Sequence, residues 1–469
     1  MENTKNLPRL RVPARASLWY IGSSVIARGI GVAMTPIFTR LLTPAEYGLY
    51  PLYNTWVGIF TVIVTLELAG AVIYRGLQKF SENKDGFISA TFGLFLAFFL
   101  SICSLYFAFG GFFNQITGLT TPITFLLFLQ IFFNTVIGFY IGRARFEYKY
   151  KSVVLLNLLS AIGIPLLSVL IILLTAVRGE ARIIGASVTT VAIGSVTLFY
   201  LLTKSSKIFD KETWKFLLRF TLPLIPHYLA ISLILRIGEI TVERVYGTDA
   251  LGRYSVAVSI GMALTVVTGG LLSALSPWIL RKIEAKSIGK IREFLLLLTK
   301  GLSLTALLIL AFAPEIMEIL AAPEFRSALP AVYALEIAVV PMFLSNAVMM
   351  GEMYYERSFI SAVPSILSAA VSILLTVTIL PFIDYRFVSL FVLISYTVLA
   401  VLNALIFKKL SGETPIHTNE TFKVLLLTIG YAAALFVFRN VLMSRIILTL
   451  PLLPILFIVG KKAIAGIKE

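Results

Sequence analysis

The sequence predicts an all-α polytopic membrane protein of about 14 transmembrane helices, arranged as two six-helix lobes with two further helices at the C-terminus. Of the 469 residues, 58% are hydrophobic and only 14% are charged, and the mean hydropathy is +0.93. Apolar runs of about 20 residues, the length that crosses a bilayer as a helix, recur from end to end. These runs are continuously apolar and do not alternate between apolar and polar residues, which favours membrane helices over a membrane β-barrel.

The expected spans are joined by loops, and the loops on one side of the membrane are rich in Lys and Arg. Because cytoplasmic loops of membrane proteins are rich in Lys and Arg, both termini are predicted to be cytoplasmic, in the inner or plasma membrane of the cell. Most of the net charge of +16 follows from this topology. The polar start of the chain runs into a full span, so no cleavable signal peptide is expected. The spans are expected at residues 17–39, 48–73, 87–109, 121–142, 152–176, 183–203, 217–241, 252–279, 294–313, 329–351, 359–381, 387–407, 421–438 and 444–460.

An internal match supports two lobes. RLLTPAEYGLY at Arg40–Tyr50 and RVYGTDALGRY at Arg244–Tyr254 share Arg, Gly and Tyr in register. Six spans per half give the halves the same orientation, so the repeat axis is expected along the membrane normal. The predicted parts are an N-lobe (1–203), a cytoplasmic linker (204–216), a C-lobe (217–410) and a C-terminal helix pair (411–469).

Arg28 lies near the middle of the first span, where a charge is expensive and is expected to face protein or water. Ser24, Arg28, Gly31 and Thr35 follow the i, i+4, i+7, i+11 spacing of one helix face. This stripe predicts the wall of an interior cavity. The alternative is a structural ion pair between Arg28 and Glu67 of the next span.

The seventh span repeats the stripe. Ser232, Arg236 and Glu239 have the same spacing, which predicts a second cavity arginine about one turn nearer the outside. Glu239 is close enough in sequence to neutralise Arg236, which is the alternative reading. Lys300 in the ninth span either attracts an anionic headgroup or extends its stem to the cytoplasmic surface.

The carboxylates Glu67, Glu239 and Glu336 fall within predicted spans. Each is a candidate for binding a coupling proton or Na⁺, or for an ion pair that fixes helix packing. One cysteine and two histidines exclude an intrachain disulfide framework and a histidine-based metal centre. The chain has no P-loop, so an ion gradient, the membrane potential or product removal is expected to drive transport.

The opening block RLLTPAEYGLYPLYNTWVGIF…LELAGAVIYRGLQK resembles polysaccharide-repeat-unit (O-antigen) flippases of the multidrug/oligosaccharidyl-lipid/polysaccharide exporter superfamily. The loop GFYIGRARFEYKYKS and the segment SAVPSILSAAVSILLTVTILPFIDY are similar to later parts of the same family, so the resemblance covers essentially the whole chain. Arg28 and Arg236 match positions where that family places cavity charges.

The resemblance implies a transporter, not an enzyme: an alternating-access flippase, acting as an antiporter. Its expected substrate is a polyprenyl-(pyro)phosphate-linked oligosaccharide, moved from the inner to the outer leaflet. It also implies a monomer that contacts membrane lipids and polysaccharide assembly enzymes, with no nucleic acid and no cofactor beyond Na⁺ or H⁺. The alternatives are a lipid II flippase and a membrane-embedded glycosyltransferase or polymerase. A cationic-drug exporter is disfavoured because the expected cavity contains arginines.

Overall fold

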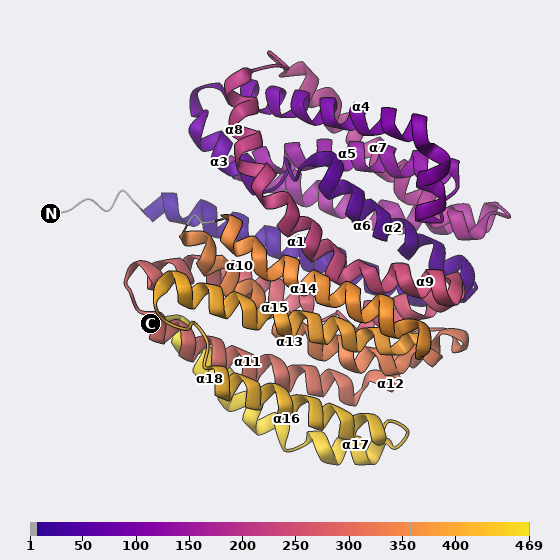
Figure 1. Cartoon of the computed structure of the whole chain (residues 1–469), viewed down its shortest axis with the longest axis vertical. Coiled ribbons are helices and arrows are strands. Elements are labelled where there is room, and N and C mark those ends of the chain that lie inside the picture. Colours follow the sequence, from indigo (N-terminus) through magenta and orange to yellow (C-terminus); the bar gives the residue numbers. More distant parts are fainter. Residues whose placement is uncertain (1–6, 356–357, 469) are drawn as a thin grey trace. The chain divides into compact units, whose positions relative to one another are not determined.

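The computed structural model describes residues 7–355 and 358–468, and all regular secondary structure within them is helical. Figure 1 labels the α-helices in chain order. The helices form two compact units. Unit 1 contains the described residues up to Leu42 together with Leu49–Leu229, and unit 2 contains Thr43–Gly48 and the described residues from Ala230 onward.

In unit 1, the central packing joins α6 to α7, α5 to α7, and α1 to α6. The short amphipathic helices α3 and α8 contact each other and α4 at one end of the unit. Gly118 ends α4 in the left-handed conformation that glycine adopts most readily. The helices of this unit are α1 (Leu7–Leu41), α2 (Pro44–Thr65) from Leu49 onward, α3 (Ala71–Lys79), α4 (Lys84–Thr117), α5 (Thr121–Phe146), α6 (Tyr150–Leu174), α7 (Arg178–Thr203) and α8 (Lys211–Thr221), followed by the start of α9 (Ile225–Gly261).

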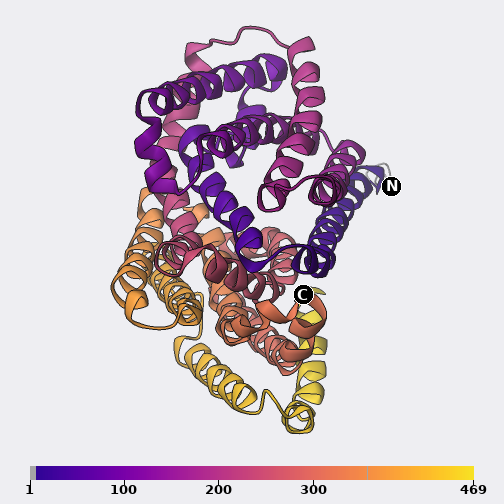
Figure 2. The same ribbon diagram turned by 90° about the vertical axis from the view of Figure 1, so that its right-hand side faces the viewer.

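In unit 2, α13 lies at the centre and packs most extensively on α15, with α10 and α11 also against it. The C-terminal helices α16 and α18 pack on α11, and both Figure 1 and Figure 2 show these yellow helices at one edge of the unit. The helices after α9 are α10 (Thr265–Glu284), α11 (Ile288–Ala311), α12 (Ala313–Leu320), α13 (Leu329–Tyr354), α14 (Ser358–Ile379), α15 (Val388–Ser411), α16 (Thr418–Val437), α17 (Leu442–Thr449) and α18 (Leu452–Lys468).

The helices confirm the predicted fold class. In the part of the chain that the structure describes, 11 segments are long and apolar enough to cross a membrane. The expected spans fall on these segments and on α1, α2 and α10, except that the expected eighth span, 252–279, is divided between the end of α9 and α10. The protein is therefore a multi-pass membrane protein.

The second span differs from its expected course. The sequence predicts one helix over residues 48–73, but α2 ends at Thr65 and α3 begins at Ala71. Leu66 and Glu67 between them have φ angles of 51° and 53°. Such left-handed residues interrupt the helical hydrogen bonds and cost about 1–3 kcal/mol each, and the apolar pattern gave no sign of them.

The corner between the first two spans is a capping box at the start of α2. Thr43 Oγ1 accepts a hydrogen bond from the Glu46 backbone N–H at 3.3 Å, and Glu46 Oε2 accepts one from the Thr43 N–H at 2.9 Å. Pro44 occupies the first helical position, where no N–H is needed. The TPAE sequence therefore fixes where α2 begins.

The two glycines that the internal match pairs, Gly48 and Gly252, lie against each other within unit 2. A Cβ at Gly252 would lie 1.9 Å from the Pro44 carbonyl oxygen and 3.1 Å from the Gly48 nitrogen. A Cβ at Gly48 would lie 3.0 Å from the Gly252 nitrogen and 2.1 Å from the Thr248 oxygen. Both repeats have glycine at this position because the two backbones approach too closely for a side chain to fit between them.

The Gly252→Ala variant is expected to lower the melting temperature of the purified protein, because the added methyl meets backbone atoms that cannot rotate away. Overpacking of this kind costs about 1–3 kcal/mol. Gly289→Ala is the matched control, since a Cβ there meets nothing within 4 Å. An alanine in that open helical position is neutral or stabilising by up to about 1 kcal/mol. Equal melting temperatures for the two variants would contradict the close packing at Gly252.

Candidate functional site

Arg28 lies on the face of α1 that turns away from α6. Its neighbour Ser23 is buried at the contact between these two helices, where Asn157 Nδ2 donates a hydrogen bond to Ser23 Oγ at 3.4 Å. Arg28 itself is exposed, as is Ser24. The stripe predicted from the sequence is therefore turned away from the helix that supports α1.

The other two stripe residues extend this face toward the end of α1. A Cβ at Gly31 would meet nothing within 4 Å, so the helix surface beside Arg28 is open. Thr35 is buried and donates to the Gly31 carbonyl at 3.4 Å. The open part of the stripe thus runs from Ser24 to Gly31, and Thr35 closes it.

The structure does not contain the alternative ion pair between Arg28 and Glu67. Over the residues that the structure describes, neither side chain has an ion-pair partner. Glu67 lies half-buried in the break between α2 and α3, and Tyr228 on α9 lies within the electrostatic reach of its carboxylate. A carboxylate at a broken membrane helix is the arrangement in which transporters hold ions, because unwound backbone and side chain can both contribute oxygens.

The second predicted stripe lies on α9 in unit 2. Ser232, Arg236 and Glu239 are all half-buried. Arg236 and Glu239 each take part in further polar or electrostatic contacts, and the Glu239 carboxylate lies in the field of the buried Tyr254 phenol. In contrast to the exposed Arg28, Arg236 is partly enclosed by its own unit.

Lys300 lies half-buried on α11, in the electrostatic field of Glu420 near the start of α16. Glu420 also accepts a hydrogen bond from Lys423 at 2.8 Å. Lys300 therefore lies beside the C-terminal helices.

Glu336 on α13 is the most isolated carboxyl group of the candidate set. Its exposed fraction is 0%, and among the residues that the structure describes neither carboxyl oxygen has a hydrogen-bond partner. An ionised carboxylate in such a place costs several kcal/mol. A bound proton or cation at Glu336 would remove this cost. No group of three His, Cys, Asp or Glu side chains suited to a metal occurs in the described ranges.

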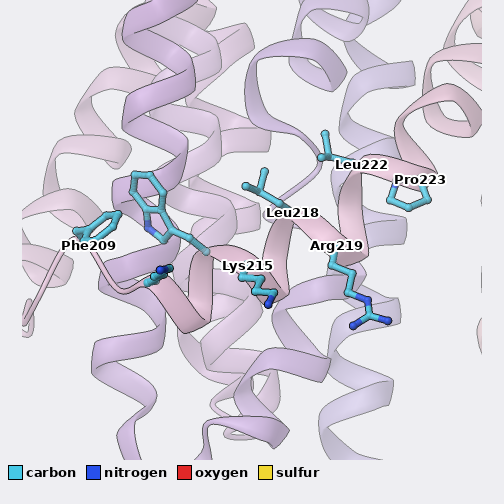
Figure 3. A pocket seen from close by; sticks show the side chains of 8 residues that line it. Phe209, Lys215, Leu218, Arg219, Leu222 and Pro223 are labelled. Carbon is cyan, nitrogen blue, oxygen red and sulfur yellow. The ribbon is translucent and has the colours of Figure 1, made fainter.

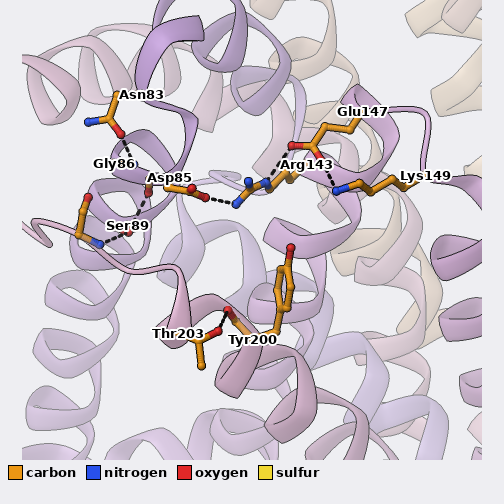
Figure 4. A network of polar contacts seen from close by, with 10 residues as sticks. Asn83, Asp85, Gly86, Ser89, Arg143, Glu147, Lys149, Tyr200 and Thr203 are labelled. Atoms are coloured by element: carbon orange, nitrogen blue, oxygen red, sulfur yellow. Dashed lines mark hydrogen bonds and ion pairs between the residues drawn. The ribbon is translucent and has the colours of Figure 1, made fainter.

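One end of unit 1 is held by an ionic network that spans α4, α5 and the turn before α6 (Figure 4). Arg143 on α5 donates to Asp85 at the start of α4 and, at 3.1 Å, to Glu147. Lys149 Nζ lies 2.6 Å from Glu147 Oε2. Although burial acts to raise the pKa of Glu147, the hydrogen bonds from Lys149 and Arg143 hold it below the ordinary value. The network keeps the ends of these helices together.

Two further side chains were not singled out from the sequence. The Arg182 guanidinium on α7 lies over the rings of Phe38 and Tyr50, at 4.2 and 4.4 Å from their centroids. The sequence places Arg182 at the edge of a span, where it looks like an ordinary loop cation. Tyr228, next to Glu67 in space, carries no sequence signal because 161 residues separate the two positions in the chain.

A family model decides the family. The model described as "Polysaccharide biosynthesis protein" matches residues 14–282, which is more than half of the chain. The chain belongs to this family. Among curated proteins, none matches the sequence significantly.

Solved structures share the fold of this polysaccharide biosynthesis family member. An inward-facing multidrug resistance MATE family transporter of the MOP superfamily has a TM-score of 0.65 at 15% identity, with coverage of 87% of this chain and 98% of that one. A Vibrio cholerae MATE transporter variant has a TM-score of 0.61 at 16% identity, with coverage of 90% of this chain and 100% of that one. A Pyrococcus furiosus MOP superfamily transporter has a TM-score of 0.60 at 16% identity, with coverage of 88% of this chain and 99% of that one. Its binding pocket is described as having reversed polarity.

These comparisons confirm the predicted helical fold of a polysaccharide biosynthesis protein. The protein is therefore a member of the polysaccharide biosynthesis family that has the fold of these transporters. The comparisons do not test the individual site residues, which remain predictions.

Proposed function

We propose that this protein is an alternating-access flippase for a polyprenyl-(pyro)phosphate-linked oligosaccharide, moving it from the inner to the outer leaflet for cell-surface polysaccharide assembly. The observation that carries the proposal is Arg28: a permanently charged side chain on the first span, exposed and without a carboxylate partner in the described residues. A membrane protein tolerates such a charge where a ligand or water compensates it. The family's role in polysaccharide biosynthesis supplies the substrate class.

The chemistry of arginine suits the phosphate of this substrate. Its planar fork donates paired hydrogen bonds to phosphate oxygens and stays charged when partly dehydrated. Arg28 on α1, with Ser24 beside it, would bind the phosphate in unit 1. Arg236 and Ser232 on α9 are the corresponding candidates in unit 2. The oligosaccharide would occupy the same polar space, while the polyprenyl tail stays in lipid. A cationic drug is disfavoured because it would meet arginines.

In this proposal both termini are cytoplasmic, because the basic loops then face the cytoplasm. The host is the inner or plasma membrane, and polysaccharide assembly enzymes supply the substrate and take up the product. We take the monomer as the working unit, because each chain carries both lobes.

Proton or Na⁺ coupling is assigned to the carboxyl groups, first to Glu336. The Glu336→Gln variant keeps the shape and hydrogen-bonding capacity of the side chain but cannot exchange a proton. We expect it to lower gradient-driven transport by about tenfold, within the usual 5–150-fold range of coupling between sites, while transport without a gradient is unchanged. Glu293→Gln on the exposed face of α11 is the control. A Glu336→Gln protein that still responds fully to the gradients would exclude this residue from coupling.

The proposed function is tested by reconstituting the purified protein in liposomes with defined lipid-linked headgroups. A polyprenyl-diphosphate oligosaccharide should become accessible on the opposite leaflet, and lipid II should be moved more slowly. Preferential movement of lipid II would favour the lipid II flippase. Polymer formation from added sugar donors without any translocation would favour the glycosyltransferase or polymerase.

A further inference from the structure

The helix α8 combines a packed face with an uncompensated basic face. Thr213, Leu217 and Thr221, spaced four residues apart, are buried against the unit. The basic stripe of α8 consists of Lys211, Lys215 and Arg219, which have the same spacing and are all exposed. A shift of two residues along a helix is about 200°, so the stripe points away from the buried face.

Unit 1 holds α8 firmly in this orientation. The side chain of Asp210 caps the helix by accepting a hydrogen bond from the Thr213 N–H at 2.8 Å. Trp214 Nε1 donates to the Ala90 carbonyl of α4 at 2.9 Å, and Glu212 forms an ion pair with Lys79 of α3 at 3.2 Å. The helix is therefore a fixed element of unit 1 and not a loosely attached linker.

The charge of the basic stripe is not balanced by protein. Glu212, the one acidic residue in α8, is paired with Lys79. Within the described part of the chain, Lys211, Lys215 and Arg219 have no carboxylate at ion-pair distance. Three like charges at successive i, i+4 positions repel each other, so an anion alongside them would relieve this repulsion.

An apolar groove runs beside the basic stripe. Its volume is about 650 Å³, and apart from the three cations it is lined by Phe209, Trp214, Leu218, Leu222 and Pro223. Figure 3 shows Lys215 and Arg219 projecting from one side of α8, and Leu218 and Leu222 from another. A basic edge next to an apolar groove with a tryptophan is the surface that an interfacial helix presents to a membrane.

We propose that α8 and its flanking residues form a binding site for an anionic phospholipid. The basic stripe would hold the headgroup phosphate, and the groove would take the upper part of an acyl chain. Charge complementarity selects an anionic over a zwitterionic lipid, because each Lys or Arg near a charged membrane surface adds about 1 kcal/mol of attraction, roughly fivefold in affinity. The site does not depend on which substrate the lobes transport.

The test is lipid binding to the full-length, delipidated protein, measured by native mass spectrometry with phosphatidylglycerol and phosphatidylcholine. Because each of the three cations contributes roughly fivefold, we expect phosphatidylglycerol to bind on the order of 100-fold more tightly. The triple variant Lys211→Gln/Lys215→Gln/Arg219→Gln should lose this difference. The matched control Lys286→Gln/Lys290→Gln/Lys409→Gln removes the same number of exposed charges from unit 2 and should keep it.

Three results would overturn the proposal. Equal affinity for the two lipids would show that charge does not select the ligand, and equal losses in both triple variants would show that only net charge matters. Displacement of phosphatidylglycerol by an equimolar polyprenyl diphosphate would assign the surface to the transported substrate. Melting temperatures within about 2 °C of the wild type confirm that the variants remain folded, since exposed substitutions cost little stability.

Discussion

The Arg28→Ala variant is expected to reduce translocation of the lipid-linked oligosaccharide by at least about 100-fold while the protein still inserts and folds. The loss follows from removing charged hydrogen bonds to phosphate, each worth about 1.5–3 kcal/mol. Folding is spared because the Arg28 side chain is exposed and has no ion-pair partner in the described residues. The measurement is headgroup accessibility in proteoliposomes at equal protein content.

Two further variants test whether the effect is specific to the Arg28 guanidinium. Arg28→Lys should recover only part of the rate, because a single ammonium replaces a planar fork. Arg178→Ala, at an exposed position at the start of α7, removes the same charge elsewhere in unit 1 and should transport like the wild type. If Arg28→Ala translocates the lipid-linked oligosaccharide at the wild-type rate, Arg28 does not belong to the substrate-binding site.

The second large effect is expected from Glu315→Ala, which breaks the link between α12 and α17. Arg445 Nη1 and Nη2 donate to the two Glu315 carboxylate oxygens at 2.7 and 2.5 Å, and Nη1 also donates to the Ala311 carbonyl. The Arg445 side chain is only 3% exposed, whereas that of Glu315 is 37% exposed. Removing Glu315 therefore leaves a buried guanidinium without its counterion.

Breaking a buried ion pair in this way costs about 3–5 kcal/mol, and we expect the lower end because water reaches Glu315. The variant should melt several degrees lower, with early detachment of α16–α18. Glu318→Ala is the control, because its partner Arg326 is 40% exposed and the pair contributes little. A Glu315→Ala protein as stable as Glu318→Ala would show that the C-terminal helices do not depend on this pair.

The Glu315 pair also predicts a dependence of stability on pH. Arg445 holds the pKa of the Glu315 carboxyl below its ordinary value of 4.5. A lowered folded-state pKa means that the pair stabilises the protein fully above about pH 4.5, and that this contribution is lost as the pH falls through the lower value. The difference in melting temperature between wild type and Glu315→Ala should accordingly shrink below pH 4.5.

The sequence predicted the helical, multi-pass fold because long apolar runs have few alternatives in a membrane. The sequence shows Pro223 and Pro226 near the start of the seventh expected span, and in the structure a short 3₁₀ turn, Leu222–Leu224, joins α8 to α9 there. It missed the break at Leu66 and Glu67, because neither residue type signals a left-handed conformation.

The candidate site was predictable only in part. An arginine in an apolar run is visible in any sequence, so Arg28 and Arg236 stood out. Partners far apart in the chain did not: Tyr228 beside Glu67, and Glu315 beside Arg445, become neighbours only through packing. The match between Gly48 and Gly252 indicated a repeat, but only the structure reveals that the two glycines touch.

The central claim is that this transporter moves a lipid with an anionic, sugar-bearing headgroup. The most direct measurement compares translocation of two synthetic lipids in proteoliposomes, identical in polyprenyl tail and oligosaccharide, one with a diphosphate linkage and one with a neutral linkage. The account predicts protein-dependent movement of the diphosphate lipid and at least about 100-fold slower movement of the neutral one, since the charged hydrogen bonds are lost. Equal movement of the two lipids, or movement of neither, would contradict it.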